Sequence, residues 1–386
     1  MLRLSLVLVL WLSAGTANAV DLTSMQAMAL GNREIVQLYI TRLEQSDREI
    51  DRAKSGYYPS VDLGYTANVL DDSSMLEYRR NAVANGRVSW NLFSGFSRRY
   101  GLQSAEIERQ IAEFRLQGIM QDLQLNVALA YLTVYDRHAN RRVAEAAFQN
   151  LTRVYQDGEN RYQVGLIGKN ELLKFRVDYD NANITLQAAD ASLQTSINQL
   201  SREIGAPVSL TDLDFAEFTV LPALVDRAEH AELMLAERSE IKVLEAVLAA
   251  AGSRSEIAKS EYYPKVDLVG SYRRYDDELI SGTGSEEDDE LRGQLVLSMN
   301  LFQGFNTEAT LAKARLEERA VGYELEELKQ TLLTELDNLV IGLRVSLDNV
   351  EVSLRSIEQA EENLRITQLK YQEGLERESD LLNAIT

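Results

Sequence analysis

The sequence predicts a mainly α-helical protein with a small β part, and three observations lead to this fold class. Only four prolines occur in 386 residues, so helices can run for long distances without interruption. One large segment of sequence occurs twice along the chain, as an internal duplication. Each copy holds two runs in which apolar and polar residues alternate, as they do along a β-strand. We therefore expect four short strands and several very long helices.

The N-terminus predicts a secretory signal peptide. Arg3 is basic, residues 4–12 are apolar, and Ala17-Asn18-Ala19 has the small residues of a cleavage site. The alternative, a membrane anchor, is disfavoured because the apolar run is much shorter than the ~20 residues that span a bilayer. We assign residues 1–19 to the signal peptide and expect the rest of the chain to be exported.

Three phrases recur and define the duplication. A-K-S-x-Y-Y-P-x-V-D-L begins at Ala53 and returns at Ala258, 205 positions later. N-L-F-x-G-F begins at Asn91 and returns at Asn300, 209 positions later, as does the Y-Q-x-G-L phrase of residues 162–166. The second copy therefore holds four additional residues between the first two phrases. We assign residues 20–206 and 223–386 to the two repeats and residues 207–222, which end at Pro222, to the linker.

The elements follow in the same order in each copy. Residues from about 22 to 56 are expected to be helical, and two strands follow. Residues 97–163 and 306–372 predict two helices of 67 residues, because apolar positions recur every three or four residues. A return helix follows to about residue 203. The acidic run at residues 285–290 is expected in the loop between the strands of the second copy.

The alternating runs are each near ~10 residues, the length of a transmembrane β-strand. An open sheet in lipid would leave backbone groups unpaired, and four strands are too few to close, so several copies of the chain must combine. The alternative is an ordinary soluble hairpin packed on one face. The residues predicted to face lipid are Val61, Leu63, Tyr65, Val88, Trp90, Leu268, Leu295 and Leu297.

The duplication, with its Tyr-Tyr-Pro strand opening, its N-L-F-x-G-F transition and its Gly-Leu turns, resembles the TolC-like outer-membrane efflux and type I secretion ducts. The resemblance implies a homotrimer whose four strands per subunit form a twelve-stranded transmembrane β-barrel. It also implies that long antiparallel helices form a periplasmic α-barrel. Such a duct carries substrates outward together with a periplasmic adaptor protein and an inner-membrane transporter of the RND or ABC type. The alternative is a periplasmic coiled-coil scaffold without a channel.

The resemblance also implies roles for the turns between the helices. In the family these turns dock the adaptor and close the inner end of the duct. The docking residues carried over are Val164, Gly165, Leu166, Gly374 and Leu375, and the gate residues are Glu171, Tyr371, Asp380 and Asn383. Two positions depart from the family pattern, since Glu376 replaces a basic residue and Asn383 replaces an acid. Three copies of Asp380 around an axis would favour cations.

The charge and the residue composition disfavour a nucleic-acid-binding protein, an enzyme and a metalloprotein. A formal net charge of −20 disfavours nucleic acid as a partner. The chain has no cysteine, and His138 and His230 stand in unrelated contexts without a phosphate-binding loop or a metal motif. We therefore expect no enzymatic activity, no cofactor and no metal. Forty residues lead from Gly165 to Gly205, whereas twelve follow Gly374, so the second copy is expected to lack most of its return helix.

Overall fold

The computed structural model describes residues 21–73, 79–276, 279 and 287–385. The described residues are 72% helical and contain one four-stranded antiparallel sheet, which confirms the predicted fold class. The predicted signal peptide, residues 1–19, lies outside the described residues. Among the residues that are described, no helix is both long enough and apolar enough to cross a membrane.

The two longest helices have the bounds that the sequence predicts. Each has 67 residues and is about 100 Å long at the standard rise. The α-helices are α1 Leu22–Asn32, α2 Glu34–Ser55, α3 Ser97–Gln163, α4 Lys169–Ile204, α5 Arg227–Glu237, α6 Ser239–Lys259, α7 Asn306–Gln372 and α8 Glu378–Ile385. Three short 3-10 turns are η1 Leu210–Asp212, η2 Ala216–Thr219 and η3 Ser260–Tyr262.

The helix expected over residues 22–56 is divided in two. Arg33 has extended backbone angles, with φ −80° and ψ 124°, and separates α1 from α2. Gly31 and Asn32 precede it, and both are weak helix formers. The Arg33 side chain reaches α4, where its Nη1 atom donates to the Arg202 carbonyl at 2.8 Å. This contact with a segment far along the chain favours the break.

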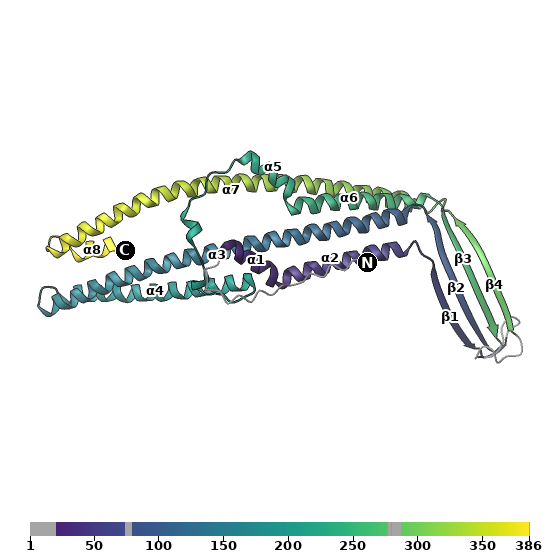
Figure 1. Ribbon diagram of the computed structural model, residues 1–386, viewed down its shortest axis with the longest axis horizontal. Coiled ribbons are helices and arrows are strands. Elements are labelled where there is room, and N and C mark those ends of the chain that lie inside the picture. The colour runs from purple at the N-terminus through teal and green to yellow at the C-terminus, as the bar shows by residue number, and fades with distance from the viewer. Residues whose placement is uncertain (1–20, 74–78, 277–278, 280–286, 386) are drawn as a thin grey trace. The chain divides into compact units, whose positions relative to one another are not determined.

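The strands are β1 Ser60–Val69, β2 Arg80–Ser94, β3 Lys265–Asp276 and β4 Glu287–Ser298, and they lie side by side in chain order (Figure 1). Ser60 pairs with Ser89 in the first hairpin, and Lys265 pairs with Ser298 in the second. Adding 205 to the first number and 209 to the second converts one pair into the other. The duplication is therefore preserved in the strand register.

The acidic run was expected in a loop, but residues 287–290 belong to β4, where Glu290 pairs with Arg273. Residues 285 and 286 lie outside the described part of the chain. Pairing with β3 satisfies the backbone groups on one side of this acidic segment and holds it in the sheet despite its low strand propensity.

The chain forms two compact units, and each takes segments from both repeats. One comprises the described residues of Met1–Val36, Ile119–Arg227 and Asp337–Thr386, and the other comprises Gln37–Gly118 and Ala228–Leu336. The second unit contains the whole sheet, and its helices pack through buried Ile107, Ile111 and Ala250. The repeats of residues 20–206 and 223–386 thus divide the sequence differently from the compact units.

Candidate functional site

The strand register places all eight residues predicted to face lipid on one side of the sheet. Val61 pairs with Val88, and Trp90 pairs with Leu268, which in turn pairs with Leu295. Directly opposed residues of antiparallel strands share a face. Leu63, Tyr65 and Leu297 occupy the same face at alternate positions. All eight side chains are exposed, from 40% for Trp90 to 87% for Leu63.

The opposite face of the sheet is polar. One row across the four strands is Asp62, Arg87, Ser271 and Arg292. Asn91 of β2 donates its Nδ2 hydrogen to Oδ1 of Asp267 in β3 at 2.7 Å. The sheet is therefore amphipathic, with one exposed apolar face and one face that suits water.

Aromatic residues mark both ends of the apolar face. Tyr65 lies in one row across the four strands with Arg274 and Asp289. Charged side chains therefore first occur on this face in the row of Tyr65. At the other end, the indole of Trp90 donates to the Tyr57 carbonyl at 3.0 Å. Rings with one apolar and one polar end suit a boundary between lipid and water.

One β-bulge alters the predicted alternation at this end. The register with β3 shifts between Asn91 and Phe93, so that Phe93, and not Leu92, pairs with Val266. Leu92 is therefore the additional residue of the bulge and has no opposed residue in β3. The extra residue increases the local twist where β2 leads toward α3.

The two predicted docking turns have the same backbone geometry. Gly165 and Gly374 have φ of 76° and 72°, which glycine adopts without steric cost. Leu166 donates its backbone N–H to the Arg161 carbonyl at 2.8 Å, and Leu375 donates in the same way to Lys370 at 2.9 Å. These bonds end α3 and α7 in Schellman turns. The docking role of these turns stays a prediction.

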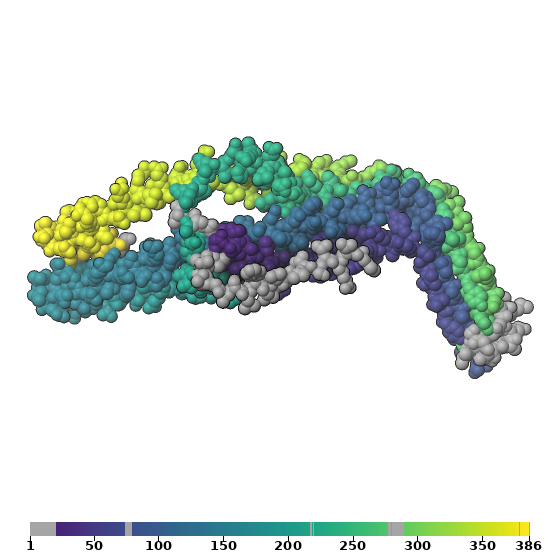
Figure 2. Space-filling view, viewed as in Figure 1, coloured from purple at the N-terminus to yellow at the C-terminus, as the bar shows by residue number. Residues whose placement is uncertain are grey.

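The apolar side chains at the turns are exposed. Val164, Leu166 and Leu375 have exposed fractions of 71%, 73% and 76%. Figure 2 shows the turn from α7 to α8 and the turn from α3 to α4 side by side, in yellow and teal. The two turns therefore present apolar groups near each other at one end of the first compact unit.

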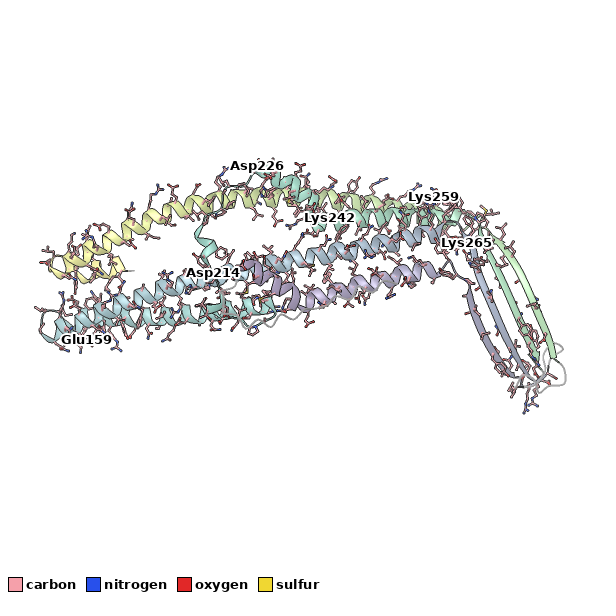
Figure 3. All side chains as sticks on the ribbon, in the orientation of Figure 1. Glu159, Asp214, Asp226, Lys242, Lys259 and Lys265 are labelled. Carbon is pink, nitrogen blue, oxygen red and sulfur yellow. The ribbon has the colours of Figure 1, made fainter. Side chains whose placement is uncertain are left out.

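Behind the turns lies a small buried core. It consists of Phe175 of α4, Tyr371 of α7 and Leu381 of α8. Arg161 lies over the Tyr371 ring, 4.9 Å from its centre, and its Nε atom is 2.8 Å from Asp157. Tyr371, predicted as a gate residue, is thus buried, with 8% of its surface exposed. Glu159, labelled in Figure 3, lies next to this core and accepts a hydrogen bond from Tyr155 at 2.7 Å.

The other predicted gate residues lie around this core. Glu171 is half-buried in the first turn of α4, and Asp380 and Asn383 are exposed on α8. Asn383 lines a groove between α4 and α8 together with Leu173 and Ser379. The four residues therefore share one end of the unit, and their roles in gating stay a prediction.

Sequence reasoning missed Phe175, Gly158 and Arg161. Phe175 is only 1% exposed, yet its repeat position in the second copy is Ala384. A search for positions where the copies differ most in volume would have found it. A comparison of the three repeated sequences alone could not have found Phe175, because none of them includes this part of α4.

The histidines hold no shared site. The His138 ring stacks on Phe215 with centres 6.2 Å apart, and His230 lies on α5. Within the described ranges, no three His, Cys, Asp or Glu side chains come together as a metal site requires. The expectations that the chain needs no metal or cofactor and is no enzyme stay predictions.

Comparisons with known proteins agree with this architecture. The model of the family described as outer membrane efflux protein matches residues 26–206 and 231–386. Protein CyaE of Bordetella pertussis is 24% identical over 94% of this chain and 78% of its own length. Outer membrane protein TolC of Escherichia coli is 22% identical over 94% of this chain and 75% of its own. The solved structure of VceC from Vibrio cholerae has a TM-score of 0.76 at 18% identity and covers 94% of this chain and 89% of that one.

The family match covers both repeats, including the strands, the long helices and the turns. The solved VceC structure shares the same arrangement of helices and strands. The chain therefore belongs to the outer membrane efflux protein family and is an outer-membrane exit duct for efflux or type I secretion, with a periplasmic helical extension.

Proposed function

We propose that three copies of this chain close into one twelve-stranded barrel that crosses the outer membrane. The observation that carries this proposal is the continuous apolar face of an open four-stranded sheet, on which Leu63, Leu295 and Leu297 are more than two-thirds exposed. In lipid, exposure of these side chains is favourable, but the unpaired sheet edges are costly. Pairing β4 of one copy with β1 of the next removes the edges. The polar row of Asp62, Arg87 and Arg292 then lines a water-filled lumen.

The inner end of the duct is proposed to lie at the turns of Gly165 and Gly374. In this proposal Glu171, Tyr371, Asp380 and Asn383 control the constriction. Asp380 is exposed on α8, so three copies near one axis would produce a negative field that favours cations. Tyr371 contributes by holding α7 and α8 against α4 through the buried core.

The exposed residues of the same turns are proposed to bind the partner proteins of the duct. The exposed apolar residues Val164, Leu166 and Leu375 offer a binding surface to a periplasmic adaptor protein. The adaptor connects the duct to an inner-membrane transporter of the RND or ABC type. Apolar anchors surrounded by polar residues are typical of such interfaces.

Two variants of the same strand test the barrel. Leu295→Arg places a charge on the apolar face, and Gln294→Arg places it on the opposite face. A charge near the bilayer midplane costs about 2–4 kcal/mol, so the first variant should lower the yield of membrane-inserted trimers and the second should not. Native mass spectrometry and conductance in planar bilayers measure both.

The control is the unchanged protein, which should give trimers and single-channel currents. A stable monomer that retains all four strands would contradict the proposal. Trimers that carry no current would instead favour the coiled-coil scaffold.

A further inference from the structure

The first part of the linker between the repeats is folded. Ser209 donates its backbone N–H and its hydroxyl to Oδ2 of Asp212, at 2.8 and 2.7 Å. Leu213 is buried. Ala216, the first residue of η2, donates its N–H to the Asp214 carboxylate at 2.9 Å. Local hydrogen bonds and one buried leucine therefore give this part of the linker a defined shape.

Two phenylalanines of the linker pack on α3. The Phe215 ring lies 5.3 Å from both the Tyr131 and the Tyr135 ring, centre to centre. The Phe218 ring lies 5.7 and 5.6 Å from the same two rings. Tyr131 is fully buried, and its hydroxyl donates to the Asp214 carbonyl at 2.5 Å. We call these contacts the aromatic anchor, because they join the linker to α3.

The second repeat has no equivalent of this surface. Adding 209 to the positions of Tyr131 and Tyr135 gives Val340 and Arg344 of α7. An aliphatic and a charged side chain do not offer the two rings on which the phenylalanines pack. The aromatic anchor is therefore a property of α3, although α3 and α7 have the same length and the same place in the duplication.

The other end of the linker is fixed to α7. Arg227, the first residue of α5, donates from Nε to Oδ1 of Asp337 at 2.7 Å and from Nη2 to Oδ2 at 3.2 Å. Met234 of α5 then packs on the buried residues Leu325 and Leu332 of α7. The ion pair is exposed and contributes little by itself. We call the ion pair and this core together the α7 anchor.

Only residues 219–226 lie between Phe218 and Arg227, and we call this segment the tether. Residues 221–226 have no regular secondary structure. Asp214 and Asp226, which are labelled in Figure 3, lie beside the aromatic anchor and the α7 anchor. A segment of this length spans at most ~30 Å when fully extended. The tether therefore restricts the distance between its two anchors.

The two anchors lie at corresponding heights on the long helices. Subtracting 209 from the position of Asp337 gives Ala128, one helical turn before Tyr131. Both α3 and α7 continue without a break from these positions to the turns at Gly165 and Gly374. At the standard rise this distance is about 50–55 Å in each helix.

Between this height and the turns, α7 has little buried surface. No residue of α7 from 333 to 366 is buried in the chain. At the turns, Tyr371 of α7 packs in the core that contains Phe175 of α4. Within the described residues, this half of α7 is therefore held to the first repeat at its two ends, by the core at the turns and by the tether.

We propose that the tether limits how far α7 separates from α3 when the core around Phe175 opens, and so favours closure of the duct. This inference rests on the proposed closure at the turns. Groups that a short tether holds together meet again at a high effective concentration, so the opened core re-forms readily. Phe215, Phe218 and Tyr131 are in this view positioning residues for closure, because they act through the tether and do not line the constriction.

Lengthening the tether tests this role without altering either anchor. Four Gly-Ser pairs inserted between Pro222 and Ala223 of the full-length protein roughly double the connection between the anchors. The effective concentration falls roughly as the −3/2 power of tether length, so the ratio of open to closed time in planar bilayers should rise about threefold. Pro222 and Ala223 are exposed, so the thermal unfolding midpoint should not change.

The matched control has the same insertion between Val208 and Ser209, before the aromatic anchor. It lengthens the linker equally but leaves the connection between the anchors unchanged, so its ratio of open to closed time should equal that of the unchanged protein. Phe215→Ala with Phe218→Ala removes the aromatic anchor and should raise this ratio more than the insertion after Pro222 does.

The outcomes separate the tether from the closure on which it rests. A rise for the insertion after Pro222 alone supports the tether. Equal rises for both insertions would show that any longer linker disturbs the channel, which overturns the inference. No rise for either insertion, in channels that Phe175→Ala does open, overturns the tether and leaves closure at the turns intact. If Phe175→Ala also has no effect, the proposed closure fails and the tether with it.

Discussion

Gly158 of α3 lies directly against the ring of Phe175 of α4. A Cβ atom at position 158 would stand 2.6 Å from Cδ2 of that ring. Phe175 is 1% exposed and is surrounded by the core that also holds Tyr371 and Leu381. A glycine within a long helix thus allows the two helices of this turn to approach closely.

Gly158→Ala is expected to destabilise the protein although alanine favours helices. Overpacking costs about 1–3 kcal/mol, against a gain of about 1 kcal/mol in helix propensity. Gly101→Ala is the matched control on the same helix, because nothing lies within 4 Å of its Cβ position. Thermal unfolding followed by circular dichroism should show a lower midpoint for the first variant and an equal or higher one for the second. Equal increases for both would contradict the close packing.

Phe175→Ala is expected to loosen the inner end of the duct. Removing a buried phenylalanine costs about 3–5 kcal/mol, and here the loss falls on the contact between α4, α7 and α8. Bilayers that contain the variant should show larger or more frequent open currents than the unchanged protein. Ile184→Ala, at a position that is 63% exposed on the same helix, should leave the currents unchanged. Identical currents for all three proteins would show that the core around Phe175 does not help to close the inner end of the duct.

Asp380→Ala should reduce the preference of the channel for cations, because an exposed negative charge is lost from each copy. The reversal potential across a salt gradient measures this preference. Asp348→Ala is the control, since Asp348 is exposed on α7, 26 residues before Gly374. A reversal potential that shifts for Asp348→Ala and not for Asp380→Ala would place the selective charge elsewhere.

The ion pair between Arg227 and Asp337 should contribute stability that depends on pH. Arg227 Nε and Asp337 Oδ1 are 2.7 Å apart, and this hydrogen bond lowers the pKa of Asp337. The contribution is therefore fully present above the unfolded pKa of an aspartate, near ~3.9, and is lost as the pH falls through the lowered folded value. Because the pair is solvent-exposed, its effect should be small and weaker at high salt.

Asp337→Asn tests this prediction. Its melting temperature should be slightly below that of the unchanged protein at pH 7, and the difference should shrink as the solution is acidified below pH 4. If the difference in melting temperature grew as the pH fell, the ion pair between Arg227 and Asp337 would not be the source of the pH-dependent stability.

Much of the local structure could be predicted because it depends on short-range physics. The glycines at 165 and 374 end α3 and α7, since only glycine readily adopts their positive φ. Alternation with a period of two assigns Val61, Leu63 and Leu295 to one face, whichever strands become neighbours. The two hairpins have equivalent registers in the structure, in agreement with the duplication of their sequences.

By itself the sequence determined the limits of the two long helices, the strand faces and the duplicated plan. Only the tertiary structure decided how the duplicated parts differ. The break at Arg33 depends on α4, and the register shift beside Asn91 depends on β3. The core around Phe175 joins three helices from both copies. Identical phrases give Ser260 a buried place and leave Ser55 exposed. In each case the deciding contact is with residues far along the chain, and neither local periodicity nor spacing specifies such contacts.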